Sequence, residues 1–338
     1  MKLKQLFIGV AAVAGLAAFT NVQAKDLEKV TFGTNWFAQA EHGGFYQAKA
    51  EGIYEKYGLD VEIKMGGPQV NGMQLLAAGR IDMLMGYPMA SIKAVSEGLP
   101  VVTVAGIFQK DPQAIIAHSD VSSLQDLADK KLPLYIATSA HTSFYPWLKA
   151  KYGFTDDMVR PYTFSVAPFL ADKGVAQQGY VTSEPYAVMQ GGETPNVFLM
   201  ADSGYPPYAE TIETTRKMLK TKPDTVKRFV QATMEGWVSY MNNPAPGNAL
   251  IKKDNPEMTD DQIAFSLKTL KQYQMISGGD AATLGLGVMT DARWQTLYDL
   301  MVQEKLLEKP VNIKDVYSLE FLPAAPVLLP SATAVAAE

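Results

Sequence analysis

Aromatic and polar side chains crowd a short stretch that follows the first predicted strand. The stretch carries an amide, an indole, a carboxylate, an imidazole and a phenol, at Asn35, Trp36, Glu41, His42 and Tyr46. An indole offers a flat face for stacking, and the carboxylate and the amide offer directional hydrogen bonds. Two adjacent glycines, Gly43 and Gly44, would let the backbone approach a ligand at the start of a helix. These residue types predict a binding loop for a small flat molecule, although packing of Trp36 and Phe37 in the core would explain the same rings.

Further polar and aromatic side chains follow later predicted strands. They are Tyr87, Ser139, His141, Phe144, Glu184 and Tyr205. In open α/β sheets ligands bind at the carboxyl ends of the strands, so these side chains are candidates for one binding cleft. Simpler explanations stay open, because a turn tyrosine can lie on the surface and a serine before a helix is often only a cap. The loops that carry these residues contain no lysine or arginine, which favours a neutral or cationic ligand over a sulfonate or nitrate.

Catalytic chemistry is restricted by what the chain lacks. The sequence contains no cysteine and three histidines, His42, His118 and His141. The absence of cysteine excludes a thiolate nucleophile, a cysteine-ligated zinc or iron–sulfur site and a lipid-anchored cysteine. The histidines are too dispersed for a metal site, and no metalloprotease, serine-hydrolase or phosphate-loop motif occurs, so we expect neither a metal nor a cofactor. One enzymatic hypothesis stays open, an exported hydrolase that uses Glu41, Glu184 and His42.

Short apolar runs alternate with helical patterns along residues 29–108, and glycine or proline marks each change. This rhythm predicts a mostly parallel sheet with helical crossovers. The predicted strands are residues 30–34, 59–65, 81–86 and 101–108, and the predicted helices are residues 44–57, 70–78 and 89–97.

A second α/β unit follows, and a largely helical segment completes the chain. The second unit has predicted strands at residues 114–117, 134–138 and 179–182, and predicted helices at 123–128, 143–152 and 169–178. The later helices are predicted at residues 224–241, 259–274 and 291–304. The pattern indicates one lobe, an inserted lobe and a helical return that packs on the first lobe.

The two ends of the chain differ from the rest. Two lysines precede the apolar run 6–19, and Val22-Gln23-Ala24 has the small-x-small pattern of a cleavage site. We therefore expect residues 1–24 to be a secretory signal peptide, cleaved after Ala24, and the protein to be periplasmic. With 30 basic and 35 acidic residues, the net charge of −5 argues against nucleic acid as a partner. The carboxyl-terminal residues 323–338 are rich in proline, alanine and valine and are expected to form a loose tail.

Three stretches of the chain resemble one known family. They are residues 35–61, residues 76–82 (Leu-Ala-Ala-Gly-Arg-Ile-Asp) and residues 179–185 (Gly-Tyr-Val-Thr-Ser-Glu-Pro). Here the chain resembles periplasmic substrate-binding proteins of ABC importers, in the branch that includes binders of thiamine pyrimidine precursors. Related binders of sulfonates, nitrate, riboflavin and aromatic acids share the scaffold. The resemblance implies an α/β type II periplasmic-binding-protein fold, in which two lobes close on a ligand at a hinge cleft.

The resemblance also implies a division of the chain and a role for particular residues. The first lobe would comprise residues 25–110 and 206–322, and the inserted lobe residues 111–205, with crossovers near residues 109–113 and 202–206. Residues 132–141 depart from the glycine-rich turn of the family. The residues implied for the cleft are Trp36, His42, Tyr46, Tyr87 and Glu184.

One relative in this branch is an enzyme rather than a carrier. It is a eukaryotic pyrimidine synthase that consumes its own histidine and needs a cysteine-rich iron site, and a chain without cysteine is not expected to share that activity. We therefore expect a monomeric, non-enzymatic carrier that delivers a small flat heterocycle, similar to a thiamine pyrimidine precursor, to an ABC permease. Riboflavin, a sulfonate or an aromatic carboxylate are alternative ligands, the last because a helix amino end near residues 139–143 could hold a carboxylate.

Overall fold

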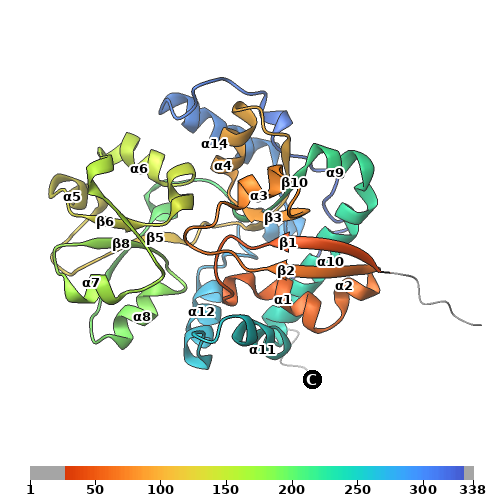
Figure 1. Ribbon diagram of the computed structural model, residues 1–338, viewed down its shortest axis with the longest axis horizontal. Helices are drawn as coiled ribbons and strands as arrows, with labels where there is room; N and C mark the ends of the chain where they lie inside the picture. The colour runs from red at the N-terminus through yellow and green to blue at the C-terminus, as the bar shows by residue number, and fades with distance from the viewer. Residues whose placement is uncertain (1–26, 331–338) are drawn as a thin grey trace, which may run out of the picture.

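Two five-stranded sheets form the framework of the molecule, and the computed structural model describes residues 27–330 (Figure 1). The strands of the first sheet are β1 (Glu28–Gly33), β2 (Leu59–Lys64), β3 (Met83–Gly86), β4 (Val101–Phe108) and β10 (Ala209–Thr215). Their order is β2-β1-β3-β10-β4, with β10 antiparallel to both neighbours and β1 parallel to β2 and β3. All residues of β4 are buried, as its almost continuous apolar sequence predicts for a strand covered on both faces. We call this sheet and its helices lobe 1.

The second sheet lies beside the first and belongs to the inserted segment of the chain (Figure 1). Its strands are β5 (Gln113–Ala117), β6 (Leu134–Ile136), β7 (Val159–Pro161), β8 (Ala176–Tyr180) and β9 (Asn196–Leu199). Their order is β7-β6-β8-β5-β9, and β5 runs antiparallel to both of its neighbours. The chain enters this sheet between Phe108 and Gln113 and leaves it between Leu199 and Ala209. We call this sheet and its helices lobe 2.

Helices cover both sheets, and those after β10 belong to the return segment. The helices of lobe 2 are α5 (Leu124–Asp129), α6 (Tyr145–Tyr152), α7 (Ala167–Ala171) and α8 (Glu184–Gln190). The helices before the first crossover are α1 (Gly43–Ala50), α2 (Ile53–Lys56), α3 (Gly72–Ala77) and α4 (Pro88–Ser96). The return segment forms α9 (Arg216–Thr221), α10 (Pro223–Asn242), α11 (Ala245–Asp254), α12 (Asp260–Gln272), α13 (Ala281–Leu284) and α14 (Asp291–Gln303). Threonine hydroxyls cap α12 and α14, where Thr259 and Thr290 accept hydrogen bonds from backbone amides three residues on.

The predicted strands of lobe 1 and the three long helices of the return segment are confirmed. Two helix predictions are corrected, and one strand was missed. The helix predicted at 169–178 ends at Ala171, and its last residues belong to β8, because pairing with β5 and β6 overrides a weak local preference. The helix predicted at 44–57 is broken at Gly52, whose φ of 66° is left-handed. Strand β10 was not predicted at all, although it lies inside the first sheet.

The two adjacent glycines of α1 have a packing role that the sequence interpretation missed. A Cβ atom at Gly44 would lie 2.2 Å from the indole of Trp237, and one at Gly43 would lie 1.9 Å from the ring of Tyr240. Both rings belong to α10, so the glycines allow two helices to approach closely. The expectation that Gly43 and Gly44 bring backbone to a ligand is therefore replaced by a role in helix packing.

The ends of the chain need separate comment. The predicted signal peptide and residues 331–338 lie outside the described residues. Before residue 331, the predicted loose tail is in fact attached to lobe 1, because Val327 accepts a hydrogen bond from the Leu286 amide at 2.8 Å. The side chains of Leu322 and Leu329 pack against the same core. Between residues 27 and 330, no helix is both long and apolar enough to cross a membrane.

Candidate functional site

A small pocket lies where the two lobes meet, and we call it the inner pocket. Its volume is about 20 Å³, so there is little free space at this point of the lobe boundary. Trp36 comes from the loop after β1, Tyr87 from the turn after β3, and Tyr180 from the end of β8. The other residues that line it are Gln39, Gln113, Ser139, Gln178, Gly179 and Glu184. None of these residues is a lysine or an arginine, so the polar groups of the pocket are carboxylate, amide and hydroxyl.

A hydrogen-bond network joins the two lobes beside this pocket. The amide of Asn35 donates to the hydroxyl of Tyr87 at 2.9 Å and to the carboxyl group of Glu210 at 3.1 Å. From lobe 2, the hydroxyl of Tyr180 donates to Glu210 at 2.8 Å and forms a further hydrogen bond with Tyr87. Glu210 has a φ of 51°, a left-handed conformation that is costly for a residue with a side chain and is often found at functional sites. The network therefore joins the lobes, and two of its members, Tyr87 and Tyr180, also line the inner pocket.

Two aromatic rings face each other across the lobe boundary. Trp36 of lobe 1 and Tyr162 of lobe 2 are almost parallel, with centroids 5.9 Å apart and an interplanar angle of 11°. Phe164 meets the edge of Trp36 at 5.9 Å and encloses the pair. Trp36 and Tyr162 belong, with Ala137, to one buried apolar cluster at the lobe boundary. A flat ligand could stack on either ring only if the lobes moved apart and separated the pair.

Glu184 is positioned next to these rings at the first residue of α8. Its carboxyl group accepts hydrogen bonds from the Tyr162 hydroxyl at 2.8 Å and from the Tyr180 amide at 2.7 Å. A Cβ atom at Gly179 would lie 2.8 Å from the Cβ of Glu184, so glycine is needed there for this close approach. Burial raises the pKa of Glu184, and the two donors partly oppose that rise. The carboxyl group can therefore accept a hydrogen bond from a ring amino group of a ligand.

Burial also governs the titration of the groups around the network. Burial raises the pKa of Glu41 to about 7 and that of Glu210 to about 8. It lowers the pKa of His42 to about 3, so the imidazole is neutral. The Nε2 atom of His42 donates to the Asn35 side-chain oxygen at 3.1 Å, which leaves Nδ1 as an acceptor. His42 thus orients Asn35 from behind the pocket rather than contacting the pocket itself.

The structure brings together only part of the predicted site. Asn35, Trp36, Tyr87, Ser139 and Glu184 meet at the lobe boundary. Five other predicted residues line neither the inner pocket nor a neighbouring cavity of about 510 Å³. They are Glu41, His42, Tyr46, Phe144 and Tyr205.

Packing explains where these other residues lie. The Tyr46 ring is buried in the core of lobe 1, and its hydroxyl donates to Asp254 of α11 at 3.1 Å. Phe144 and Tyr205 belong to a second core cluster, where Tyr205 packs on Trp147 at 5.1 Å. These positions correct the expectation that the three rings face the cleft.

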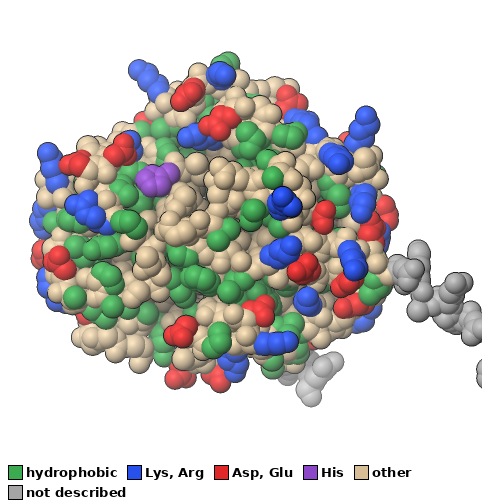
Figure 2. All heavy atoms as spheres, viewed as in Figure 1, with side chains coloured by type: hydrophobic (Ala, Val, Ile, Leu, Met, Phe, Trp, Pro, Cys, Tyr) green, Lys and Arg blue, Asp and Glu red, His purple; other side chains and the backbone are tan. Residues whose placement is uncertain are grey.

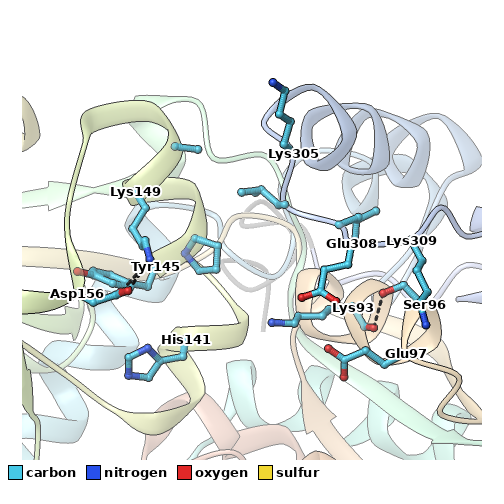
Figure 3. Close-up of a pocket in the computed structure, with 14 residues that line it drawn as sticks. Lys93, Ser96, Glu97, His141, Tyr145, Lys149, Asp156, Lys305, Glu308 and Lys309 are labelled. Atoms are coloured by element: carbon cyan, nitrogen blue, oxygen red, sulfur yellow. Dashed lines mark hydrogen bonds and ion pairs between the residues drawn. The ribbon is translucent and has the colours of Figure 1, made fainter.

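The last predicted residue, His141, lies in a wider groove on the outer side of the lobe boundary. This groove has a volume of about 630 Å³ and is walled by residues of both lobes (Figure 3). His141 and the Lys149–Asp156 ion pair lie on the lobe 2 side, whereas Lys93 and Glu308 lie on the lobe 1 side. The prediction for His141 therefore concerns the entrance to the cleft and not the inner pocket.

The three residues of the hydrolase hypothesis form no hydrogen bond with one another in the described part of the chain. Both carboxyl oxygens of Glu41 are buried and form no hydrogen bond with any described residue. His42 is bonded to Asn35, and neither Glu41 nor Glu184 is its partner in the described part of the chain. A general base must reach the proton that it removes, directly or through one water molecule. Within residues 27–330, no cluster of three metal-ligating side chains is present either.

Sequence reasoning missed several residues of the site. Tyr180 and Glu210 supply half of the lobe-to-lobe network, and Tyr162 supplies one face of the aromatic pair. Tyr180 ends a strand whose start was predicted as helix, and Glu210 lies in the unpredicted β10. The signal that could have revealed β10 is its content of threonine and isoleucine, Thr-Ile-Glu-Thr-Thr, which favours a strand.

This architecture of two α/β lobes with a site at their boundary is the periplasmic-binding-protein fold. The aliphatic sulphonate binding protein SsuA from Escherichia coli has a similar structure, with a TM-score of 0.63 and 15% sequence identity over 90% of this chain and 96% of that one. The chain belongs to the NMT1/THI5 like family, whose model matches residues 39–246.

Relatives of this chain carry names of both binding proteins and enzymes. The riboflavin-binding protein RibY of Chloroflexus aurantiacus is 25% identical over 93% of this chain and 91% of its own length. The formylaminopyrimidine-binding protein of Halalkalibacterium halodurans is 22% identical over 94% and 98%. A protein of Legionella pneumophila named 4-amino-5-hydroxymethyl-2-methylpyrimidine phosphate synthase is 20% identical over 88% and 93%.

Proposed function

We propose that this protein is the substrate-binding component of an ABC importer and that it binds a small planar heterocycle carrying N–H donors. The observation that carries the proposal is the pair of near-parallel rings, Trp36 and Tyr162, that lies beside the carboxyl group of Glu184. Stacking supplies contact area, and a buried acceptor selects ligands that can donate to it. The names of the two full-length relatives, which refer to a flavin and to an aminopyrimidine, support a nitrogen-rich ring.

Lobe closure supplies the mechanism of capture. The chain crosses between the sheets twice, so the lobes can rotate about these crossovers. A ligand that contacts Trp36 and Tyr162 together binds the closed arrangement better than an open one and shifts the population towards it. Closure then presents one composite surface to a membrane permease. The apolar run 6–19 supports export to the periplasm, and we propose a monomeric carrier that releases its ligand chemically unchanged.

One face of the molecule carries charges of both signs without a basic stripe (Figure 2). Figure 2 shows basic and acidic side chains interspersed over one face of the molecule, with apolar side chains between them. A nucleic-acid partner would instead require a clustered basic stripe.

A ligand panel tests this proposal directly. An aminopyrimidine, riboflavin, benzoate and an alkanesulfonate are titrated into the protein, and its melting temperature is followed. A ligand at 100 times its dissociation constant stabilises a protein by about 2.7 kcal/mol. We expect stabilisation by the aminopyrimidine or the flavin, and recovery of that compound unchanged by chromatography. Stabilisation by the sulfonate alone would refute the proposed ligand class, and conversion of the bound compound would refute a carrier.

Replacement of Trp36 by alanine is expected to weaken binding of the stabilising ring compound tenfold or more. This corresponds to about 1.4 kcal/mol. The reason is that one face of the aromatic pair disappears, whereas Tyr162 remains in place. Titration calorimetry measures the dissociation constant. The affinity of Trp36→Phe, which keeps a smaller stacking face, should lie between those of the wild type and Trp36→Ala. Equal affinity in all three proteins would show that the ligand does not stack on Trp36.

Replacement of Glu184 by glutamine is expected to reduce affinity for the aminopyrimidine by tenfold or more. The variant keeps the shape of the side chain but substitutes a neutral amide for a carboxyl group that accepts two hydrogen bonds. The matched control is Glu55→Gln on the exposed side of α2, which should leave the dissociation constant unchanged. Calorimetry on both variants measures the dissociation constants. An unaltered dissociation constant in Glu184→Gln would show that Glu184 does not contact the ligand.

A further inference from the structure

A second and larger cavity opens within lobe 1 beside the inner pocket, and we call it the side cavity. It has a volume of about 510 Å³, and its walls come from α3, β3 and α4, while residues 138–142 of lobe 2 lie across its mouth. Tyr87 and Ser139 line both this cavity and the inner pocket, so the two spaces are neighbours. At the mouth, Lys93, Glu97 and His141 also line the outer groove (Figure 3).

The walls of the side cavity are mainly apolar. The residues responsible are Val70, Met73, Leu84, Met85, Ala90 and Leu99. Among the residues that line it, Lys93 is the one basic side chain, and it stands at the mouth rather than at the floor. An apolar cavity with few polar groups is typical of sites that bind the body of a small molecule and orient it through one or two contacts.

Glu213 of β10 is a buried acid among the residues that line this cavity. Its carboxyl group is fully buried, and Oε1 accepts hydrogen bonds from the hydroxyl groups of Ser91 and, at 3.2 Å, Thr211. The other oxygen, Oε2, is buried and forms no hydrogen bond with any residue between 27 and 330. A Cβ atom at Gly86 would lie 2.3 Å from this carboxyl group, so glycine at that position makes room for it.

An unpartnered carboxyl oxygen in an apolar cavity costs free energy until a donor reaches it. Burial raises the pKa of Glu213 to about 8, although the Ser91 and Thr211 hydroxyl groups and the Tyr87 amide oppose part of that rise. A ligand that brings an ammonium or N–H group would satisfy Oε2 and favour the charged carboxylate. A ligand that brings a carboxylate or sulfonate would instead keep Glu213 protonated, because an ionised Glu213 would place two anions together.

We propose that the side cavity is a second ligand compartment, which takes an apolar molecule with an amino group and binds that group at Oε2 of Glu213. Lobe 1 builds most of the compartment, residues 138–142 of lobe 2 close its mouth, and neither ring of the aromatic pair lines it. It can therefore hold a separate amine or an amino-bearing extension of a ligand whose ring lies between the lobes. The inference goes beyond the proposed function, because it assigns a role to a buried acid that the inner pocket does not use.

Benzylamine and benzyl alcohol form a matched pair of probes for this compartment. They share an apolar ring and differ in the group that would meet Glu213. Calorimetry or protein-observed NMR on the full chain should show wild-type protein binding benzylamine about tenfold more tightly than benzyl alcohol. Glu213→Gln should abolish that preference, and Ala90→Leu, which fills the cavity without removing the acid, should weaken both probes.

The outcomes separate this inference from the proposed function. Thermal melts first establish that both variants fold. The proposal is overturned if benzylamine binds the wild type and Glu213→Gln equally, or if it binds neither protein. The second result would mean that water alone occupies the position next to Oε2 of Glu213. Benzylamine binding that depends on Glu213 but survives Trp36→Ala supports it. If the heterocycle panel finds no ligand while this dependence holds, the proposed function fails and the side compartment stands.

Discussion

The protein without ligand is expected to lose stability as the pH rises from about 5 to about 8.5. Burial raises the pKa of Glu41 and Asp111 to about 7 and that of Glu210 and Glu213 to about 8. In the unfolded chain these groups titrate near their ordinary values of about 4. Between the two ranges the folded state binds more protons than the unfolded state, so the free energy of unfolding falls as the pH increases.

The surroundings of these acids explain why the effect should be large. Glu210 meets the neutral groups Asn35 and Tyr180, and its titratable neighbours are the acids Glu41 and Asp111, which raise its pKa further when they ionise. Arg293 lies near enough to Asp111 to oppose part of its pKa rise. Each carboxyl group that is protonated only in the folded state contributes at most about 1.4 kcal/mol per pH unit. The combined loss of unfolding free energy between pH 5 and pH 8.5 should therefore reach about a few kcal/mol.

Urea unfolding at several pH values measures this slope. Glu210→Gln and Glu213→Gln each remove one titrating group while keeping its size, so each should flatten the curve and narrow the difference between pH 5 and pH 8.5. Glu55→Gln, on the exposed part of α2, is the control and should leave the slope unchanged. A stability that rises with pH over this interval would show that these acids are ionised in the folded protein.

The same acids show what local sequence pattern can and cannot predict. Most strands of lobe 1 were predictable, because apolar runs end at glycine or proline and buried parallel strands tolerate little else. β10 was not, because two glutamates interrupt its pattern and a strand with acids normally faces water. Its place between β3 and β4 buries Glu210 and Glu213, and that placement is set by the crossover from lobe 2.

The residues of the candidate site were also only partly predictable from the sequence. Loop residues such as Trp36 and Glu184 were predictable from their chemistry and from their place after strands. Their partners were not, since Tyr162 and Tyr180 become neighbours of lobe 1 only through the relative position of two sheets. Conversely, Tyr46 resembled a ligand-binding residue in the sequence, but α11 provides its partner and the ring is buried. Side-chain type therefore identified candidates, and only the topology separated side chains at the lobe boundary from those that pack in a core.

Replacement of Arg293 by alanine is expected to lower the free energy of unfolding by about 2–4 kcal/mol, since charged hydrogen bonds at a largely buried site would be lost. Arg293 lies on α14 and binds both crossovers between the lobes. Its guanidinium donates to the carbonyl groups of Gln109 on one crossover and, at 3.2 and 3.1 Å, of Pro206 and Pro207 on the other. It also stacks over the Tyr208 ring at 4.0 Å.

The geometry of this contact predicts a second effect, on lobe movement. One planar guanidinium fixes the distance between two segments about which the lobes would rotate, so its removal should broaden the range of lobe separations. Arg293→Lys retains the charge but has no planar set of donors, and should lie between the wild type and Arg293→Ala. Arg160→Ala is the matched control. Arg160 also donates to two carbonyl groups, at 2.8 Å, but it is exposed and these acceptors are its neighbours in the sequence. Urea unfolding should show a loss within about 0.5 kcal/mol for this control. Small-angle X-ray scattering should show the widest distribution of lobe separations for Arg293→Ala and no widening for Arg160→Ala. Identical scattering from all four proteins would mean that Arg293 stabilises the fold without restricting the crossovers.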